Sequence, residues 1–282
     1  MTSAWRWAGA CAIGTSHVRA NLECQDRATC LIVETGPGPV AVAVVSDGAG
    51  SARAAAQGAS IACMEFHRRA ALYLRSGGAL GKIDDELTAD WIDLIRERIY
   101  VAANFAGLKP RDYAATLVAL LANNEHCTVV HIGDGAAVVR KHQTQEWSVP
   151  SWPFHGEYAS TTRFVTDDPV ARFNLVHLES AIDRFAIFSD GMENLVLDHR
   201  EKSAPAALFE RLLQPLVIWE GVGRNRTLSR HLRDYLGSEK VCNATDDVCE
   251  SQRCLHYVFG PAPEVSEGPR EGRGRHNLPC RG

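Results

Sequence analysis

The sequence predicts an α+β domain built on antiparallel sheets. Strand-like apolar runs come in clusters along the chain, and the helical stretches come in pairs between those clusters. A doubly wound parallel sheet would instead need strands and helices that alternate regularly. The order strands, two helices, many strands, then two helices therefore favours a layered antiparallel domain.

The N-terminal half supplies the first strands and the first helical pair. We expect strands over residues 9–17, 28–35 and 39–47, followed by a helix over 52–74. The next helix carries apolar residues at the three-and-four spacing of one buried face and a threonine near its start: Thr88, Trp91, Leu94, Ile95, Ile99 and Ala102.

The second half returns to strands and closes with the second helical pair. Asn123-Asn124 and Asp134-Gly135 are turn dipeptides between expected strands. Ser203 is placed to cap one helix, and Thr227 begins another that ends at Gly237. The expected strands of this half are 114–122, 127–133, 136–141, 162–166, 172–178 and 184–189.

Composition excludes several classes of protein. The 282 residues carry a net charge of −4, which gives no electrostatic reason to expect nucleic acid or an anionic membrane as partner. No run approaches the ~18 apolar residues of a membrane span, and we expect no signal peptide. Nine irregularly spaced cysteines without a CxxC pair favour reduced thiols and a cytoplasmic protein over a disulfide framework or a zinc site. We expect a catalytic domain over 1–259 and a disordered tail rich in Gly, Pro and Arg over 260–282.

The tripeptide Ser-Asp-Gly ends two separate apolar strands. Asp47 lies in "VAVAVVSDGAGS" and Asp190 in "FAIFSDGMEN". If the two strands are neighbours, the carboxylates lie close and repel each other unless a cation lies between them. Mg²⁺ and Mn²⁺ take such oxygen ligands. A simple turn is the alternative for either motif alone. No Walker loop, Cys-x5-Arg motif or activated Ser-His set offers a different phosphate chemistry.

Seven stretches, in this order, resemble the compact bacterial branch of the metal-dependent protein phosphatases of type 2C. The resemblance implies a four-layer sandwich, in which two packed antiparallel β-sheets are flanked by α-helices. It also implies hydrolysis of phosphoserine and phosphothreonine by a water that bridges two Mn²⁺ or Mg²⁺ ions. The stretches are 14–28, 44–52, 112–121, 131–140, 156–168, 185–195 and 244–248.

The same resemblance assigns the metal ligands. Asp47 matches the acid that bridges both ions, and the carbonyl of Gly48 matches a ligand of one of them. Asp190 and Asp246 match the remaining acids of the catalytic set. Asp112 lies where some bacterial relatives place an acid for a weaker third ion.

Four further residues have candidate roles around the metals. Asp26 matches an acid that supports the ligands from behind, and Gln25 stands where many relatives carry Glu. His17 is a candidate for proton delivery to the leaving alcohol, with a structural histidine as the alternative. Arg19 is a candidate for phosphate binding, although its offset from Gln25 differs from that of the family's phosphate-binding arginine.

Two function classes remain open at this point. The first is a phosphatase that acts on phosphorylated proteins in signalling and is paired with a serine/threonine kinase. The second is a pseudophosphatase, a binding module that recognises phosphoproteins without turnover. Beyond Asp247 the chain departs from the family pattern, and strand-like alternation returns only at "CLHYVF". A strand missing there would leave a sheet edge unpaired and weaken the position of Asp246.

Overall fold

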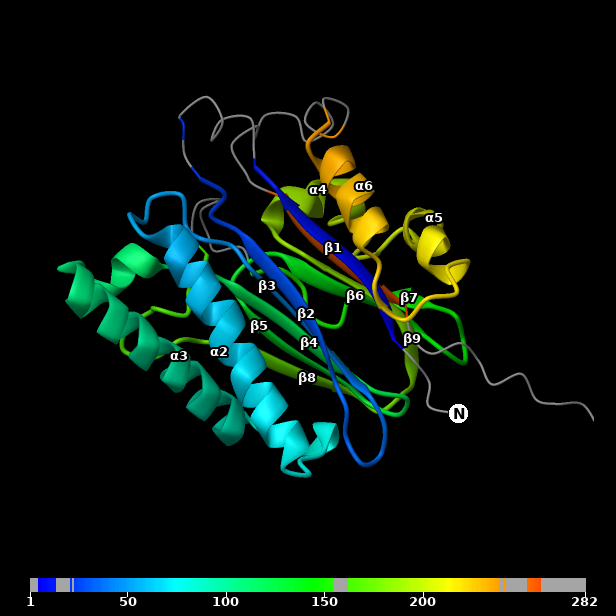
Figure 1. Cartoon of the computed structure of the whole chain (residues 1–282), viewed down its shortest axis with the longest axis horizontal. Coiled ribbons are helices and arrows are strands. Elements are labelled where there is room, and N and C mark those ends of the chain that lie inside the picture. The colour runs from blue at the N-terminus through cyan, green and yellow to red at the C-terminus, as the bar shows by residue number, and fades with distance from the viewer. Residues whose placement is uncertain are drawn as a thin grey trace, which may run out of the picture.

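Figure 1 shows the computed structural model of the chain, which describes residues 5–13, 21, 23–154, 162–238, 241 and 253–259. Several of the predicted features lie outside these residues: His17, Arg19, Asp246 and the expected tail 260–282. No helix in the described part of the chain combines the length and the apolar character that a membrane span requires.

Two β-sheets form the centre of the molecule. The strands are β1 Arg6–Ala12, β2 Arg27–Val33, β3 Val40–Ser46, β4 Leu117–Ala122, β5 Cys127–Ile132, β6 Ala136–Lys141, β7 Trp147–Ser148, β8 Asn174–Leu178, β9 Ile182–Phe188, β10 Gly223–Arg224 and β11 Arg253–Phe259. Among the described residues, one sheet has five strands in the order β2-β3-β4-β5-β8, and all its neighbours are antiparallel. The other has six in the order β10-β1-β11-β9-β6-β7, where only β1 and β10 are parallel.

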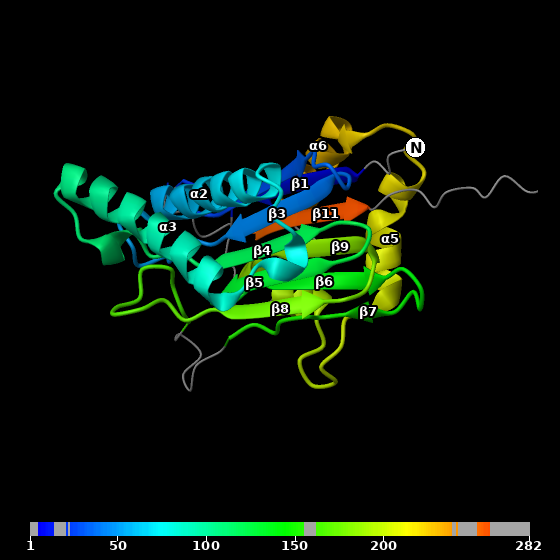
Figure 2. The same cartoon turned by 90° about the horizontal axis from the view of Figure 1, so that it is seen from below.

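Helices cover the outer face of each sheet. The long pair α2 and α3 packs on the five-stranded sheet, and α5 and α6 pack on the six-stranded sheet (Figures 1 and 2). The predicted four-layer sandwich is therefore confirmed. The helices are α2 Ala55–Arg75, α3 Asp85–Ala106, α4 Glu193–Val196, α5 Ala206–Val217 and α6 Arg226–Leu236, with 3-10 turns η1 Leu80–Lys82, η2 Pro110–Tyr113 and η3 Asp190–Met192.

Strand β3 shows why the central strands are continuous apolar runs. Val42 and Val44 pack in the core beneath α2 and α3. Ala41, Ala43 and Val45 pack in the core between the two sheets. Successive side chains of a strand point to opposite faces, so a strand covered on both sides is apolar at every position.

Strand β11 fills the middle of the six-stranded sheet. It pairs antiparallel with β1 on one side and with β9 on the other. The departure from the family pattern after Asp247 therefore does not leave this sheet without its strand. In the register of β1 and β11, Cys11 lies opposite Cys254. Cys11 is disulfide-bonded, so the expectation of reduced thiols is wrong for this residue. The cysteines described as free are Cys24, Cys30, Cys63 and Cys127.

The expected strand 162–166 is wrong. Val165 lies in a turn, and its amide donates to the carbonyl of Ala115 at 2.9 Å. The carboxylate of Asp167 accepts a hydrogen bond from the amide of Phe164 at 3.0 Å, which closes this turn. The Phe164 amide thus bonds to a nearby side chain instead of to a neighbouring strand, so no β-strand forms here.

The helix starts differ from the predicted ones by a few residues. The side chains of Asp84 and Asn225 accept hydrogen bonds from Leu87 and Leu228, each at 2.8 Å, and so cap α3 and α6. The residues at the N-cap are Asp84, Pro205 and Asn225. The sequence suggested Ser203 as the cap of the helix that is α5, and placed Thr88 and Thr227 at or near the starts of the helices that are α3 and α6.

Candidate active site

Asp47 lies immediately after β3 and is fixed there by Thr116. The amide of Asp47 donates to Oγ1 of Thr116 at 3.0 Å, and the carbonyl of Asp47 accepts from the amide of Thr116 at 2.8 Å. Ser46 adds a third bond, because its Oγ donates to the carbonyl of Thr116 at 2.6 Å. The chain before β4 therefore holds the first acidic motif in one position.

Gly48 brings the backbone of this motif close to helix α2. It forms an isolated bridge with Ala115. A Cβ atom at this position would lie 2.7 Å from the backbone carbonyl of Ala55 in the first turn of α2. Any larger residue would push the loop away from the helix, so glycine is required for the close approach rather than for an unusual backbone angle.

Asp190 follows β9 and opens the turn η3. The residue before it, Ser189, donates from Oγ to Oδ2 of Asp26 at 2.7 Å, and both residues are buried. The second acidic motif is thereby tied to the residue that precedes β2. Asp47, Asp190 and Asp26, which we call the carboxylate cluster, thus come from three separate segments.

The cluster holds its acids under mutual repulsion. Burial raises the pKa of Asp47 well above its usual range, and the neighbouring charges of Asp26 and Asp190 raise it further. Burial and the charge of Asp26 also raise the pKa of Asp190. Within the described residues, Oδ1 of Asp190 is buried without a hydrogen-bond partner. These properties fit a site for divalent cations, because a cation removes the repulsion and gives the buried oxygen a partner.

No set of three His, Cys, Asp or Glu side chains in the described part of the chain is arranged around a single ion position. Asp47 and Asp190 are two ligands of the predicted set, and the third, Asp246, lies outside the described residues. The cluster therefore contains part of the predicted ligand set.

Asp134 and Glu193 extend the acidic region, and the sequence analysis assigned neither residue a site role. Glu193 is buried and accepts a hydrogen bond from the amide of Gly135. Burial, together with the charges of Asp134 and Asp190, raises its pKa to about 8. In the sequence, the acid of "HIGDG" belongs to one of the stretches that resemble the family, and its Asp-Gly dipeptide indicates a turn. The turn is real, since Gly135 has φ +84°.

Comparison with known proteins identifies the fold family. The model of the family described as protein phosphatase 2C matches residues 13–237, a range that includes all three acids of the cluster. The chain belongs to the protein phosphatase 2C family. Serine/threonine-protein phosphatase 3 of Escherichia coli (strain K12) is 32% identical over 249 residues, which cover 86% of this chain and 95% of that protein.

Solved structures of other proteins share the fold at lower identity. The catalytic domain of PstP, solved in complex with 2 manganese ions, matches with a TM-score of 0.58 and 16% identity over 93% of this chain and 100% of that chain. PppA, described as a key regulatory component of T6SS in Pseudomonas aeruginosa, matches with a TM-score of 0.58 and 17% identity, over 92% of this chain and 99% of that chain. The serine/threonine phosphatase Stp1 from Staphylococcus aureus matches with a TM-score of 0.57 and 14% identity, over 90% of this chain and 94% of that chain.

The remaining predicted residues of this type 2C phosphatase are placed as follows. Gln25 is half-buried beside Asp26. Asp112 caps η2, where its Oδ2 accepts from the amide of Lys109 at 2.8 Å, and its carbonyl accepts from the amide of Ala54 at 2.7 Å. The structure thus gives Asp112 a structural role, and its binding of a third ion stays a prediction.

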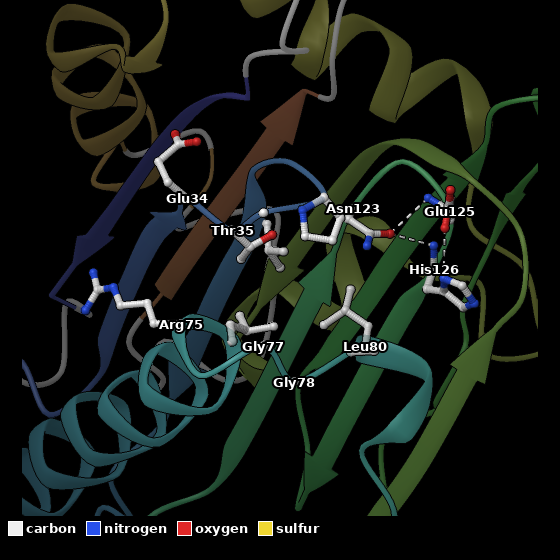
Figure 3. Close-up of a pocket in the computed structure, with 14 residues that line it drawn as sticks. Glu34, Thr35, Arg75, Gly77, Gly78, Leu80, Asn123, Glu125 and His126 are labelled. Atoms are coloured by element: carbon white, nitrogen blue, oxygen red, sulfur yellow. Dashed lines mark hydrogen bonds and ion pairs between the residues drawn. The ribbon is translucent and has the colours of Figure 1, made fainter.

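A cavity of about 420 Å³ lies at the opposite end of β2 and β3, beside the hairpin that joins them. Figure 3 shows residues that line it, among them Glu34 and Thr35 of the hairpin and Arg75 at the end of α2. On the other wall of the cavity, Oδ1 of Asn123 accepts hydrogen bonds from the amides of Glu125 and His126, so this polar group is already used within its own turn. None of the predicted metal ligands lines this cavity, so we do not assign the phosphatase chemistry to it.

Thr116→Val tests the anchor of Asp47. The substitution keeps the shape of the buried side chain but removes the acceptor of the Asp47 amide. We expect the free energy of unfolding to fall by about 1–3 kcal/mol and phosphatase activity to fall with it. Urea unfolding measures the first quantity. Thr116→Ser keeps the hydroxyl and is the control, and a valine variant as stable as wild type would show that the anchor is unimportant.

Proposed function

We propose that this protein serine/threonine phosphatase hydrolyses phosphoserine and phosphothreonine in protein substrates with two divalent metal ions, Mn²⁺ or Mg²⁺, held at the carboxylate cluster. The observation that carries the proposal is the convergence of half-buried Asp47 and Asp190 with buried Asp26 at the ends of strands from both sheets. Two such ions, when bound, supply Lewis acidity that activates a water and offsets the phosphoryl charge.

The residues of the chain have separate tasks in this proposal. Asp47 and Asp190 hold the ions as carboxylates, together with Asp246. Ser189 and Asp26 orient the ligands from behind, as supporting residues commonly do at metal sites. Thr116 fixes the backbone of Asp47 and so sets where the carboxylate lies.

The substrate class follows from the family and from the names of the relatives. The E. coli relative is named a serine/threonine-protein phosphatase, and we extend that substrate class to this chain. Phosphoserine and phosphothreonine in proteins are made by kinases, so the proposal places this enzyme opposite a serine/threonine kinase.

Metal-dependent turnover tests the proposal. We would measure hydrolysis of p-nitrophenyl phosphate and of a phosphothreonine peptide while Mn²⁺ is titrated from zero, for wild type and Asp190→Asn. We expect activity that rises with Mn²⁺ and falls about 10²–10³-fold in the variant. Asp234→Asn, on the exposed face of α6, is the charge-matched control. Folded wild-type protein without turnover at any Mn²⁺ concentration would contradict the proposal and favour the binding module.

A further inference from the structure

A second cavity, of about 450 Å³, lies between the edges of the two sheets and reaches the carboxylate cluster. Its walls come from β1 in the six-stranded sheet and from β2 at the edge of the five-stranded sheet, and α6 and β10 complete it. Asp26 lines this cavity and also belongs to the cluster, so the two sites share a wall. We call this cavity the arginine pocket, after Arg27, Arg224 and Arg233 in its lining.

Arg27 is held in place by neutral partners. Its Nε donates to Oγ of Ser60 at 2.9 Å, and one terminal nitrogen donates to the carbonyls of Cys24 and Asp26 at 2.6 and 2.8 Å. Within the described residues it forms no ion pair. The guanidinium is therefore directed toward α2, and Arg27 lines the pocket at the start of β2 without a carboxylate partner for its charge.

Arg224 and Arg233 face the same space from the other side. The guanidinium of Arg224 lies over the ring of Trp7, 5.1 Å from its centre. The face of α6 that meets β1 is marked by Ser229, whose Oγ accepts from the amide of Gly9 at 3.3 Å. Arg233 lies four residues later and so on the same face of the helix.

The charge of the arginine pocket is strongly one-sided. Arg224 and Arg233 are exposed to solvent and have no ion-pair partner among the described residues. The only acid in the described lining is Asp26, which is buried and accepts the hydrogen bond of Ser189. The guanidinium groups of Arg224 and Arg233 thus stand against one carboxylate that is already engaged in the cluster, whereas that of Arg27 is bound to Ser60 of α2.

We propose that the arginine pocket binds an oxyanion carried by a side chain next to the phosphoresidue being hydrolysed, either a second phosphate or a carboxylate. The planar fork of arginine matches both anions, and phosphate carries more charge and more acceptor oxygens. A peptide whose phosphoryl group enters the carboxylate cluster then places its neighbouring anion in the pocket. The enzyme accordingly prefers multiply phosphorylated or acidic segments. This inference rests on the proposed function.

Matched peptides test the inference separately from catalysis. The peptides share one phosphothreonine and carry phosphoserine, Asp or Ala two or three residues away on either side. For wild type we expect kcat/KM about tenfold higher with phosphoserine than with Ala and an intermediate value with Asp. The preference lies in KM rather than in kcat, and it shrinks as salt screens the charges. Whether kcat/KM is higher for the phosphoserine peptide or for the Asp peptide shows which of the two anions the pocket binds better.

Two double variants and one control make the test specific to the pocket. Arg224→Gln with Arg233→Gln is expected to reduce the preference to about twofold or less, and the corresponding Lys pair retains most of it. Arg230→Gln is the control, because Arg230 is an exposed arginine of α6 that does not line the pocket. A wild-type enzyme that treats all the peptides alike, or a Gln pair that keeps the full preference, would overturn the proposal.

Binding measurements keep the inference independent of turnover. Failure to hydrolyse p-nitrophenyl phosphate would count against the proposed function alone. In that case, fluorescence anisotropy of the same labelled peptides still compares Kd for wild type and the Gln pair. We expect the doubly phosphorylated peptide to bind about tenfold more weakly to the Gln pair, and equal Kd values would overturn the inference.

Discussion

Asp47→Asn is expected to remove most of the phosphatase activity and yet to stabilise the metal-free protein at neutral pH. Activity falls by about 10³-fold because a carboxylate proposed to hold the ions is lost. Stability rises because the substitution removes one of the mutually repelling acids of the carboxylate cluster. We expect a gain of about 1–3 kcal/mol at pH 7 without metal.

The pH dependence of this gain has a defined sign. In the unfolded chain Asp47 ionises near its usual pKa of about 4. In the folded protein the pKa is raised, so the native state binds more protons and loses stability as pH rises from about 4 toward that raised value. The difference between variant and wild type therefore shrinks when pH is lowered from 7 to 5.

Thermal unfolding with and without Mn²⁺ measures the effect. Saturating Mn²⁺ is expected to reverse the order, because binding to the native state stabilises wild type more than the variant. Asp234→Asn removes an exposed carboxylate from α6. It should change the free energy of unfolding by no more than about 0.5 kcal/mol, with or without Mn²⁺. A metal-free Asp47→Asn protein less stable than wild type at pH 7 would contradict the described repulsion.

Gly58→Ala is expected to destabilise the fold by about 3 kcal/mol or more. A Cβ on Gly58 would lie 2.1 Å from the carbonyl oxygen of Tyr113. That oxygen belongs to the backbone, so a change of side-chain rotamer cannot relieve the clash. Alanine in a helix normally stabilises by about 1 kcal/mol relative to glycine, so a loss here reports the clash. Thr116 lies three residues beyond Tyr113, so activity should fall as its hold on Asp47 loosens.

Urea unfolding and the p-nitrophenyl phosphate assay measure both consequences. Gly36→Ala is the matched control, since a Cβ there meets nothing within 4 Å and the position lies in the distant hairpin. A Gly58→Ala variant as stable as wild type would mean that α2 and η2 separate readily, and the close approach would then have no structural importance.

The sequence, together with its family resemblance, was enough to predict the layers and all three acids of the cluster. A strand that is buried on both faces, such as β3, is a continuous apolar run in the sequence and can be recognised there. The repeated Ser-Asp-Gly motif led to the prediction that Asp47 and Asp190 lie together at the ends of neighbouring strands. The two acids do interact electrostatically, but the strands that precede them, β3 and β9, belong to different sheets.

The supporting interactions were not predictable in the same way. Ser189 and Asp26 are 163 positions apart, and Asp47 and Thr116 are 69 apart, so neither bond leaves a periodic signal. Asp134 was seen as a turn residue because its dipeptide explains the turn fully. The arginine pocket combines residues from both halves of the chain, which the pairing of β10 with β1 and the packing of α6 on β1 bring together.

The place of β11 in the six-stranded sheet has a consequence for biosynthesis. It is the last strand along the described chain, yet it lies between β1, the first strand, and β9. While the polypeptide is being translated, β1 and β9 have no partner on their facing edges until this late segment emerges. Such exposed edges are where nascent chains aggregate, and pairings between distant segments form slowly. We therefore expect that the phosphatase matures only after β11 has been translated and that truncation before residue 253 yields insoluble protein.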